Sequence, residues 1–280
     1  MIMVEASRPL LVLVDGTNLL WRAAYGFPAR VMTRDSRDVT APFGFFALLR
    51  KALRELECPA ECLVIFDSET GWVGRQERYA AYKRHRLELD CAPLVWLPDI
   101  QQGLTGLGIS WQESGDWEAD DVIATIASRT RTREVLIMST DRDFHQLLGP
   151  RVSQLNTARS TRRIVTDLDV RERYLIAPGQ WCDYVAMVGD RSDGIPGIRG
   201  IGRVRAAELL AGGLQLEDLP HSGRLDSHHG RRLGDQFEQA LCWRDLVRLR
   251  TRVRPVLATR RRTTPELPLA AAVVERLGIW

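Results

Sequence analysis

Short apolar runs that end in aspartate recur along the first half of the chain. Residues 10–15, 62–67 and 135–141 each begin as an unbroken hydrophobic stretch and close on Asp15, Asp67 and Asp141. Such a run is typical of a strand buried on both faces of a parallel sheet. In open α/β sheets, ligands bind outside the carboxyl ends of the strands. The pattern therefore predicts an α/β fold with three aspartates gathered at one edge of its sheet.

Helical periodicity predicts helices between these runs, at Leu19–Tyr25 and Thr40–Leu56. A further helix is expected after Trp117, where three carboxylates precede an apolar pattern. Glu118 and Asp121 lie three residues apart and would share one face of that helix. Asp120 points elsewhere unless the helix begins near it.

The carboxylates of the acidic stretch 118–121 stay ionised together only if another group stabilises them. Neighbouring carboxylates raise one another's pKa unless a cation offsets the repulsion. One explanation is a solvated helix N-terminus, where the macrodipole favours acidic residues. The three aspartates at strand ends favour a metal site instead. Oxygen ligands without nearby Cys or His select Mg²⁺ or Mn²⁺. Two ions about 4 Å apart would suit phosphodiester hydrolysis.

Cations and aromatic residues alternate at helical spacing between residues 75 and 86. Their members are Arg75, Arg78, Tyr79, Tyr82, Lys83 and Arg86. Such a stripe suits a nucleic-acid backbone and its unstacked bases. The alternative is a solvated helix whose two tyrosines cover a neighbouring element. Arg22, about two helical turns after Asp15, is a further cation that could reach a phosphate.

A second unit is expected from Tyr174 onward, where the charge balance turns basic. Residues 1–175 carry 23 basic and 24 acidic side chains, whereas residues 176–280 carry 16 and 12. That asymmetry suits a polyanion-binding module beside a metal-binding one. The basic run 248–262, which follows an expected helix at 236–250, could face phosphate or solvent equally well.

The second unit contains a glycine-rich turn, Gly189–Gly202, before a helix expected at Arg203–Leu210. Dense glycines allow close backbone approach and leave N–H groups free for a phosphate at a helix N-terminus. The turn also carries a further acidic pair, Asp190 and Asp193.

Composition excludes several classes of protein. The five cysteines are odd in number and match neither a zinc site nor a disulfide framework, so we expect buried thiols in a reducing cytoplasm. The N-terminal apolar run is cut by Asp15 and is too short for a signal peptide or a membrane span. A soluble cytoplasmic protein with no membrane partner is expected.

In this order the motifs resemble those of the bacterial 5′ nuclease and flap endonuclease family, whose members also form the N-terminal domain of DNA polymerase I. The resemblance covers roughly residues 10–250. It is carried by Val14–Gly16 with Arg22, Phe66–Asp67, Tyr82–Lys83 with Arg86, Glu118–Asp121, Ser139–Asp143, and Gly189–Asp193 with Ile195–Gly197.

The resemblance implies a PIN-like parallel-sheet nuclease domain over residues 1–173, with a helical arch at about 70–98. A helical domain with a helix–three-turn–helix module that holds duplex DNA is implied over residues 174–280. Because no polymerase region follows Trp280, we expect a free-standing nuclease. Its implied activity is metal-dependent cleavage of DNA at 5′ flaps, nicks and 5′ ends in replication and repair.

The family's site residues carry over position by position. The first metal site corresponds to Asp15, Asp67, Glu118 and Asp120, the second to Asp141, Asp143, Asp190 and Asp193, and an acid between them to Asp121. Groups that contact the reacting phosphate correspond to Arg22, Lys83 and Arg86. DNA binding is expected from Arg75, Arg78, Tyr82, Gly197, Gly200, Gly202, Arg203 and Arg205. All nine acidic positions are filled, which favours an active nuclease.

The glycine-rich motif departs from the family pattern, which usually has Asn at Gly194 and Lys-Thr at Val204–Arg205. These departures leave open the K⁺ site that the resemblance implies at this turn. The remaining expectations are Mg²⁺ or Mn²⁺ as cofactor, RNA primers as possible further substrates, a monomer, and a location at the bacterial nucleoid. A PIN-type ribonuclease, which would not need the glycine-rich module, and a non-catalytic binding protein stay as alternatives.

Overall fold

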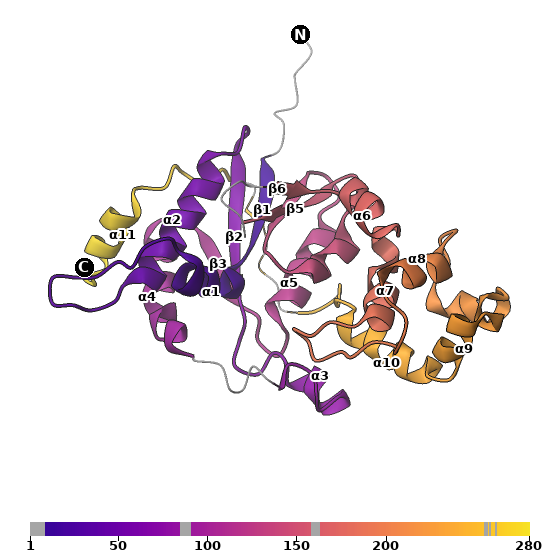
Figure 1. Ribbon diagram of the computed structural model, residues 1–280. Coiled ribbons are helices and arrows are strands. Elements are labelled where there is room, and N and C mark those ends of the chain that lie inside the picture. The colour runs from indigo at the N-terminus through magenta and orange to yellow at the C-terminus, as the bar shows by residue number, and fades with distance from the viewer. Residues whose placement is uncertain (1–8, 85–90, 158–162, 255–256, 258, 261) are drawn as a thin grey trace, which may run out of the picture.

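A six-stranded sheet forms the centre of the computed structural model, which describes residues 9–84, 91–157, 163–254, 257, 259–260 and 262–280 (Figure 1). Its strands are β1 (Leu10–Asp15), β2 (Ala60–Phe66), β3 (Ser110–Glu113), β4 (Val135–Met138), β5 (Val152–Asn156) and β6 (Arg163–Val165). Their order is β3-β2-β1-β4-β5-β6, and every neighbouring pair is parallel except the antiparallel pair β5 and β6. The predicted parallel sheet is confirmed, with the three apolar runs side by side at its centre.

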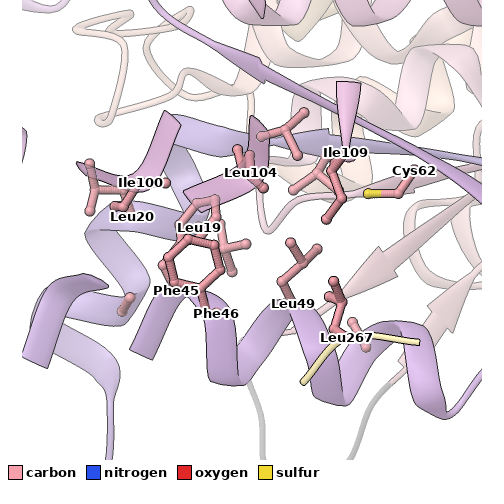
Figure 2. Packing of buried hydrophobic residues seen from close by; sticks show 14 of the residues in the cluster. Leu19, Leu20, Phe45, Phe46, Leu49, Cys62, Ile100, Leu104, Ile109 and Leu267 are labelled. Carbon is pink, nitrogen blue, oxygen red and sulfur yellow. The ribbon is translucent and has the colours of Figure 1, made fainter. Parts of the chain in front are cut away.

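Alternate residues of β1 face two different hydrophobic layers. Val12 and Val14 pack in a cluster with α1 (Gly16–Gly26), α2 (Thr40–Arg54) and α4 (Leu97–Gly106), part of which Figure 2 shows. Leu11 and Leu13 pack instead with α5 (Ala119–Arg129). Each large side chain that is fully buried contributes about 1.5–3 kcal/mol. The sheet is therefore covered on both faces, as its unbroken apolar strands require.

The helix expected over the stripe at 75–86 ends early. Helix α3 spans only Val73–Arg78, Tyr79 has extended backbone dihedrals, and a turn carries the chain through Lys83, whose φ is 50°. The reason is tertiary, because Tyr82 and Lys83 turn inward and are buried. Residues 85–90 lie outside the described residues, and the 3₁₀ helix η2 (Ala92–Trp96) follows them. Of the expected arch at 70–98, the structure thus describes these flanking pieces.

The second unit is helical. Its helices are α7 (Trp181–Val188), α8 (Arg203–Leu210), α9 (His228–Gly234) and α10 (Phe237–Val247), and α6 (Asp167–Tyr174), at the end of the first domain, contacts α8. Short 3₁₀ helices connect parts of the chain at η3 (Arg142–Leu147), η4 (Pro178–Gln180), η5 (Leu216–His221) and η6 (Arg224–Asp226). An aromatic group of Tyr174, Trp181 and Tyr184 lies in its core. The prediction for α8 is confirmed at both ends.

The C-terminal segment returns to the first domain. The expected helical domain over 174–280 therefore includes residues that pack on the nuclease domain instead. Helix α11 (Ala270–Arg276) lies beside α2, far from α7 and α10 (Figure 1). The Thr264 N–H donates to the Ala60 carbonyl at 2.7 Å, and the Cys62 N–H donates to the Thr264 hydroxyl at 2.8 Å. Apolar side chains of this segment complete the nuclease core, which is the physical reason for the return.

Two expectations from composition meet different outcomes. No helix in the described part of the chain is both long and apolar enough to cross a membrane. The cysteines are all free, but only Cys62 and Cys182 are buried, whereas Cys58 and Cys91 are exposed. The expectation of uniformly buried thiols is therefore wrong.

Candidate active site

Three aspartates end neighbouring strands at one edge of the sheet, as predicted. Asp15 is the last residue of β1, Asp67 directly follows β2, and Asp141 lies shortly after β4. The Asp15 carboxylate also caps α1, because its Oδ1 accepts the Asn18 N–H at 3.0 Å. Asp67 Oδ1 accepts the Ala119 N–H at 2.7 Å and so ties β2 to the start of α5.

Hydroxyl and amide groups that were not among the predicted site residues hold this edge in place. The Ser139 hydroxyl donates to Asp15 Oδ2 at 2.8 Å, and the Thr17 hydroxyl accepts the Asp67 N–H at 2.8 Å. Asn18 and Thr140 exchange side-chain hydrogen bonds across β1 and β4. Their position next to the aspartates was the available signal, since short polar side chains at strand ends often bond local groups.

Charges within the cluster act on one another. Burial and then the charge of Asp67 raise the pKa of Asp15 to about 7. Burial, followed by the charges of Asp15 and Asp141, raises the pKa of Asp120 well above its usual value. Asp120 therefore joins the strand-end aspartates, while Glu118 and Asp121 face other partners.

The second unit supplies acids to the same cluster. Burial, Asp141 and then Asp193 raise the pKa of Asp143 well above its usual value. Asp193 is buried in the glycine-rich turn between α7 and α8. Asp190, in the same turn, forms an ion pair with Arg142 at 2.9 Å. Both units thus contribute to one acidic site.

Glu118 is paired with cations. It is the N-cap of α5, is 5% exposed, and forms ion pairs with Lys83 and Arg75. The Tyr82 hydroxyl donates to its Oε2 at 3.1 Å. Although burial raises the pKa of Glu118, the charges of Lys83 and Arg75 outweigh burial and lower the pKa to about 2. Tyr82, which was expected to contact DNA bases, is 2% exposed and instead faces this carboxylate.

The structure corrects the roles expected of Arg75 and Asp121. Arg75 is 3% exposed, so it does not present its charge on a DNA-facing stripe. Its Nη1 and Nη2 donate to Asp121 Oδ2 and Oδ1 at 2.8 and 2.7 Å. Asp121 is 0% exposed and also accepts the Arg250 N–H at 2.8 Å. Both of its oxygens therefore have protein donors, which argues against Asp121 as a metal ligand.

The chemistry of the remaining acids fits a divalent cation. As metal ligands, these side chains offer only hard carboxylate oxygens, the type that Mg²⁺ and Mn²⁺ prefer. Burial first, and then the charges of neighbouring carboxylates, raise the pKa of Asp15, Asp120 and Asp143. A bound cation would offset both effects because it favours the ionised carboxylates. No three His, Cys, Asp or Glu side chains within the described ranges stand close enough together to enclose an ion. Lys83, Arg75 and Arg142 neutralise some of the acids in this arrangement.

The other cations expected near the phosphate are placed differently. Arg22 lies on α1, and its Nε is buried without a hydrogen-bond partner, which leaves one donor for another group. Arg78 is exposed at the end of α3. Arg86 lies outside the described residues. The roles of Arg22, Arg78 and Arg86 stay predictions.

The glycine-rich turn is tight. At Gly197 φ is 71°, and a Cβ there would lie 2.5 Å from the Gly189 nitrogen. Gly200 and Gly202 lead into α8, whose Arg203 and Arg205 are exposed. The turn thus presents positive charge at a helix N-terminus, consistent with the expected duplex contact.

Family models cover most of the chain. The model of the 5′-3′ exonuclease N-terminal resolvase-like domain matches residues 10–175, and that of the 5′-3′ exonuclease C-terminal SAM fold matches residues 176–265. This chain belongs to the 5′-3′ exonuclease family. The family predicted from the motifs is confirmed, as is the pairing of an α/β nuclease domain with a helical one.

Several curated relatives are DNA polymerases I. The thermostable DNA polymerase I of Thermus filiformis is 34% identical over 98% of this chain and 33% of its own length. DNA polymerase I of Mycobacterium leprae is 34% identical over 77% of this chain and 24% of its own length. The chain spans a third or less of these relatives.

Solved structures share the fold. A T5 5′-exonuclease variant has a TM-score of 0.64 and 23% identity, covering 86% of this chain and 88% of that chain. The catalytic core of Rad2 in complex with DNA substrate has a TM-score of 0.61 and 15% identity, covering 98% and 88%. At these identities the likeness concerns the fold alone.

Proposed function

We propose that this chain is a divalent-metal-dependent, structure-specific 5′ nuclease that hydrolyses DNA phosphodiesters at 5′ flaps, nicks and 5′ ends in replication and repair. The observation that carries the proposal is the convergence of carboxylates from both units at the carboxyl edge of the sheet. Asp15 and Asp120 come from the nuclease domain, and Asp193 comes from the helical unit. A buried cation, Lys83, lies next to them.

Mg²⁺ or Mn²⁺ is the proposed cofactor, with two or more ions bound. Asp15, Asp67 and Asp120 would hold one ion, and Asp141, Asp143 and Asp193 another. Asp141 would stand between the two ions, because its charge acts on Asp15 and Asp120 as well as on Asp143. Bound there, such ions would stabilise the attacking and leaving oxygens of the phosphodiester. The glycine-rich turn is the proposed K⁺ position.

The protein's own groups have separate tasks in this proposal. Lys83 offsets the negative charge that grows on the phosphoryl oxygens in the transition state, because a fixed charge in a water-poor site acts strongly there. Arg22 offers its unpartnered Nε to the same phosphate. The exposed Arg203 and Arg205 hold the duplex backbone, which positions the DNA without reading its sequence.

DNA as substrate is supported by what the solved neighbours contain. They include a T5 flap endonuclease complex with DNA and metal ions and the human GEN1 complex with Holliday junction DNA. The helical unit with its exposed arginines favours DNA over the PIN-type ribonuclease alternative. We further propose action as a monomer near the nucleoid, with RNA primers as possible substrates.

The test compares labelled 5′-flap, nicked and blunt DNAs, together with a flap made of RNA, in Mg²⁺, in Mn²⁺ and in excess chelator. We expect the 5′-flap DNA to be cut fastest, with a 5′-phosphate on the remaining strand, and no cutting in chelator. Preferential cutting of single-stranded RNA would favour the ribonuclease. Tight flap binding without cutting in either metal would favour a binding protein.

A further inference from the structure

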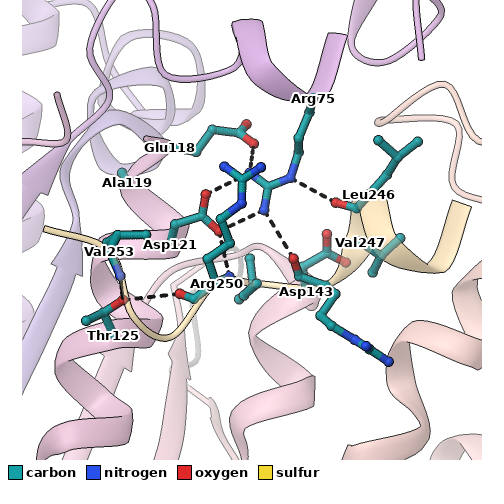
Figure 3. A network of polar contacts seen from close by, with 12 residues as sticks. Arg75, Glu118, Ala119, Asp121, Thr125, Asp143, Leu246, Val247, Arg250 and Val253 are labelled. Carbon is teal, nitrogen blue, oxygen red and sulfur yellow. Dashed lines mark hydrogen bonds and ion pairs between the residues drawn. The ribbon is translucent and has the colours of Figure 1, made fainter. Parts of the chain in front are cut away.

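All five N–H donors of the Arg75 guanidinium group are used inside the protein (Figure 3). Nε donates to the Leu246 carbonyl at 3.0 Å, and Nη2 donates to the Arg248 carbonyl at 3.2 Å. The remaining three bonds go to Glu118 and Asp121. Arginine has five donors in a planar fork and no acceptor, so none is left for a DNA phosphate.

These acceptors belong to separate parts of the chain. Glu118 and Asp121 form the N-terminus of α5 in the nuclease domain. Leu246 and Arg248 lie at the end of α10 in the helical unit, where the last carbonyls have no partner within the helix. A cation is favourable at such an end. Arg75, on α3 at the base of the arch, therefore joins three elements at one point.

The segment that leaves α10 is fastened to the nuclease domain beyond Arg75. Asp121 accepts the Arg250 N–H, and Gln146 accepts the Leu249 N–H at 2.9 Å. Thr125 donates to the Arg250 carbonyl at 3.2 Å and accepts the Val253 N–H at 3.2 Å. The start of the basic run at 248–262 is thus held through its backbone, while the Arg248 side chain stays 52% exposed.

Arg75 and Lys83 share one partner, the Glu118 carboxylate. Arg75 bonds Glu118 Oε2, whereas the Lys83 ammonium bonds Oε1 of the same carboxylate. An Arg75 that moved from its place would release one side of Glu118, and the partner that fixes the Lys83 ammonium would turn with it. The effect of Arg75 on the phosphate would therefore pass through Glu118 and Lys83.

We propose that Arg75 is a positioning residue that couples the seating of α10 on the nuclease domain to the placement of Lys83. The proposal rests on the proposed nuclease function. Its consequence is that replacing Arg75 should slow cleavage more than it weakens DNA binding, because Arg75 has no donor free for DNA.

The test uses Arg75→Lys in the full chain, since lysine keeps the charge but cannot reach all five acceptors. At saturating enzyme, the single-turnover rate constant on 5′-flap DNA should fall about tenfold or more, as misplaced catalytic groups do. DNA affinity should change by less than about threefold and its salt dependence should be unchanged, because the phosphate-binding side chains all remain. Amide hydrogen exchange of residues 246–253 should become about tenfold faster, because the contacts that hold this segment on the nuclease domain would open more often.

Two further variants sharpen the test. Asp121→Asn keeps the shape but weakens the pairing, so it should show the same pattern to a smaller degree. Arg129→Lys makes the same change as Arg75→Lys at an exposed position near the far end of α5 and should alter neither rate nor exchange.

Weaker DNA binding with a flatter salt dependence in Arg75→Lys would make Arg75 a DNA contact and overturn the proposal. Faster exchange without a slower rate would make it a purely structural residue and also overturn it. Unchanged exchange would show that Arg75 does not hold the end of α10 on the nuclease domain, and it would also overturn the proposal. A wild-type protein that cuts no DNA would refute the proposed function instead, because the exchange comparison does not depend on cleavage.

Discussion

Lys83 and Glu118 form a buried ion pair where the chain that follows α3 meets the N-terminus of α5, with side chains that are 8% and 6% exposed. Buried ion pairs are costly to form and hold their partners in one geometry, since breaking them leaves an uncompensated charge. The pair therefore fixes one of only two lysines of the chain beside the acidic cluster.

Replacing Lys83 by Ala should separate chemistry from binding. If Lys83 offsets charge that grows in the transition state, the single-turnover rate constant should fall about 10²-fold. Binding of the same 5′-flap DNA should fall far less. Lys51→Ala removes the other lysine, which is exposed on α2, and is the control. Equal losses in rate and binding would make Lys83 an anchoring residue.

Gly194 controls how closely the turn that carries Lys83 approaches the helical unit. At Gly194 φ is 72°, and a Cβ there would lie 2.4 Å from the Ala81 carbonyl oxygen. The Lys83 N–H donates to the neighbouring Asp193 carbonyl at 3.2 Å. Gly194→Ala should push this turn away, and a displacement of about 1 Å can cost about 10²-fold in rate.

Gly213→Ala is the matched control, because Gly213 also has a positive φ, 84°, but its Cβ would meet nothing within 4 Å. Both variants carry the backbone strain of about 1–3 kcal/mol. Thermal denaturation and single-turnover cleavage would compare them. Equal rates in the two variants would contradict the proposed contact.

Arg203 and Arg205 should hold the duplex through its phosphates. Changing both to Ala should weaken binding of all duplex sequences alike and reduce the log–log salt slope by up to about 0.9 for each phosphate that is no longer neutralised. Fluorescence anisotropy over a salt series measures this slope. The paired change Arg129→Ala and Arg276→Ala removes the same charge from other exposed positions. If that control flattens the slope equally, the duplex does not lie on α8.

Asp183, in the core of the helical unit, should make stability depend on pH. Burial raises its pKa to about 6, against the opposing effects of the Leu216 N–H and Arg244. Its unfolded pKa is about 3.9, so the folded state loses stability as pH rises from about 4 to about 6. Asp183→Asn removes that loss.

The Tm of Asp183→Asn should therefore exceed that of the wild type at about pH 8, and the difference should disappear near pH 4. Asp245→Asn is the control, since Asp245 pairs with the same Arg244 but is 53% exposed. A Tm difference that stays constant across this range would contradict the assignment.

The sequence predicted those elements whose signal is local. The apolar runs before Asp15, Asp67 and Asp141 located the central strands, and their shared edge followed from parallel pairing. Strands β3 and β5 were missed, because half-buried segments with Ser, Gln and Glu carry no unbroken apolar run.

The spacing of the basic stripe could not predict whether its side chains face DNA or the protein interior. Whether Arg75 faces DNA or acids depends on Glu118 and Asp121, more than forty residues away in the chain. The prediction also required one continuous helix over residues 75–86, whereas α3 ends at Arg78. The return of α11 to α2 depends in the same way on distant apolar partners rather than on local pattern.

The most direct test of the proposed function is single-turnover cleavage of 5′-flap DNA by the wild type, Asp120→Asn and Asp141→Asn, each with Mg²⁺ and with chelator. Asn keeps the shape of Asp but removes a ligand charge. We predict cleavage by the wild type in Mg²⁺ alone, losses of about 10³-fold or more in both variants, and undiminished DNA affinity. Full activity in chelator, or variants that keep more than about a tenth of the rate, roughly 1.4 kcal/mol of barrier, would contradict a metal-dependent site at this edge of the sheet.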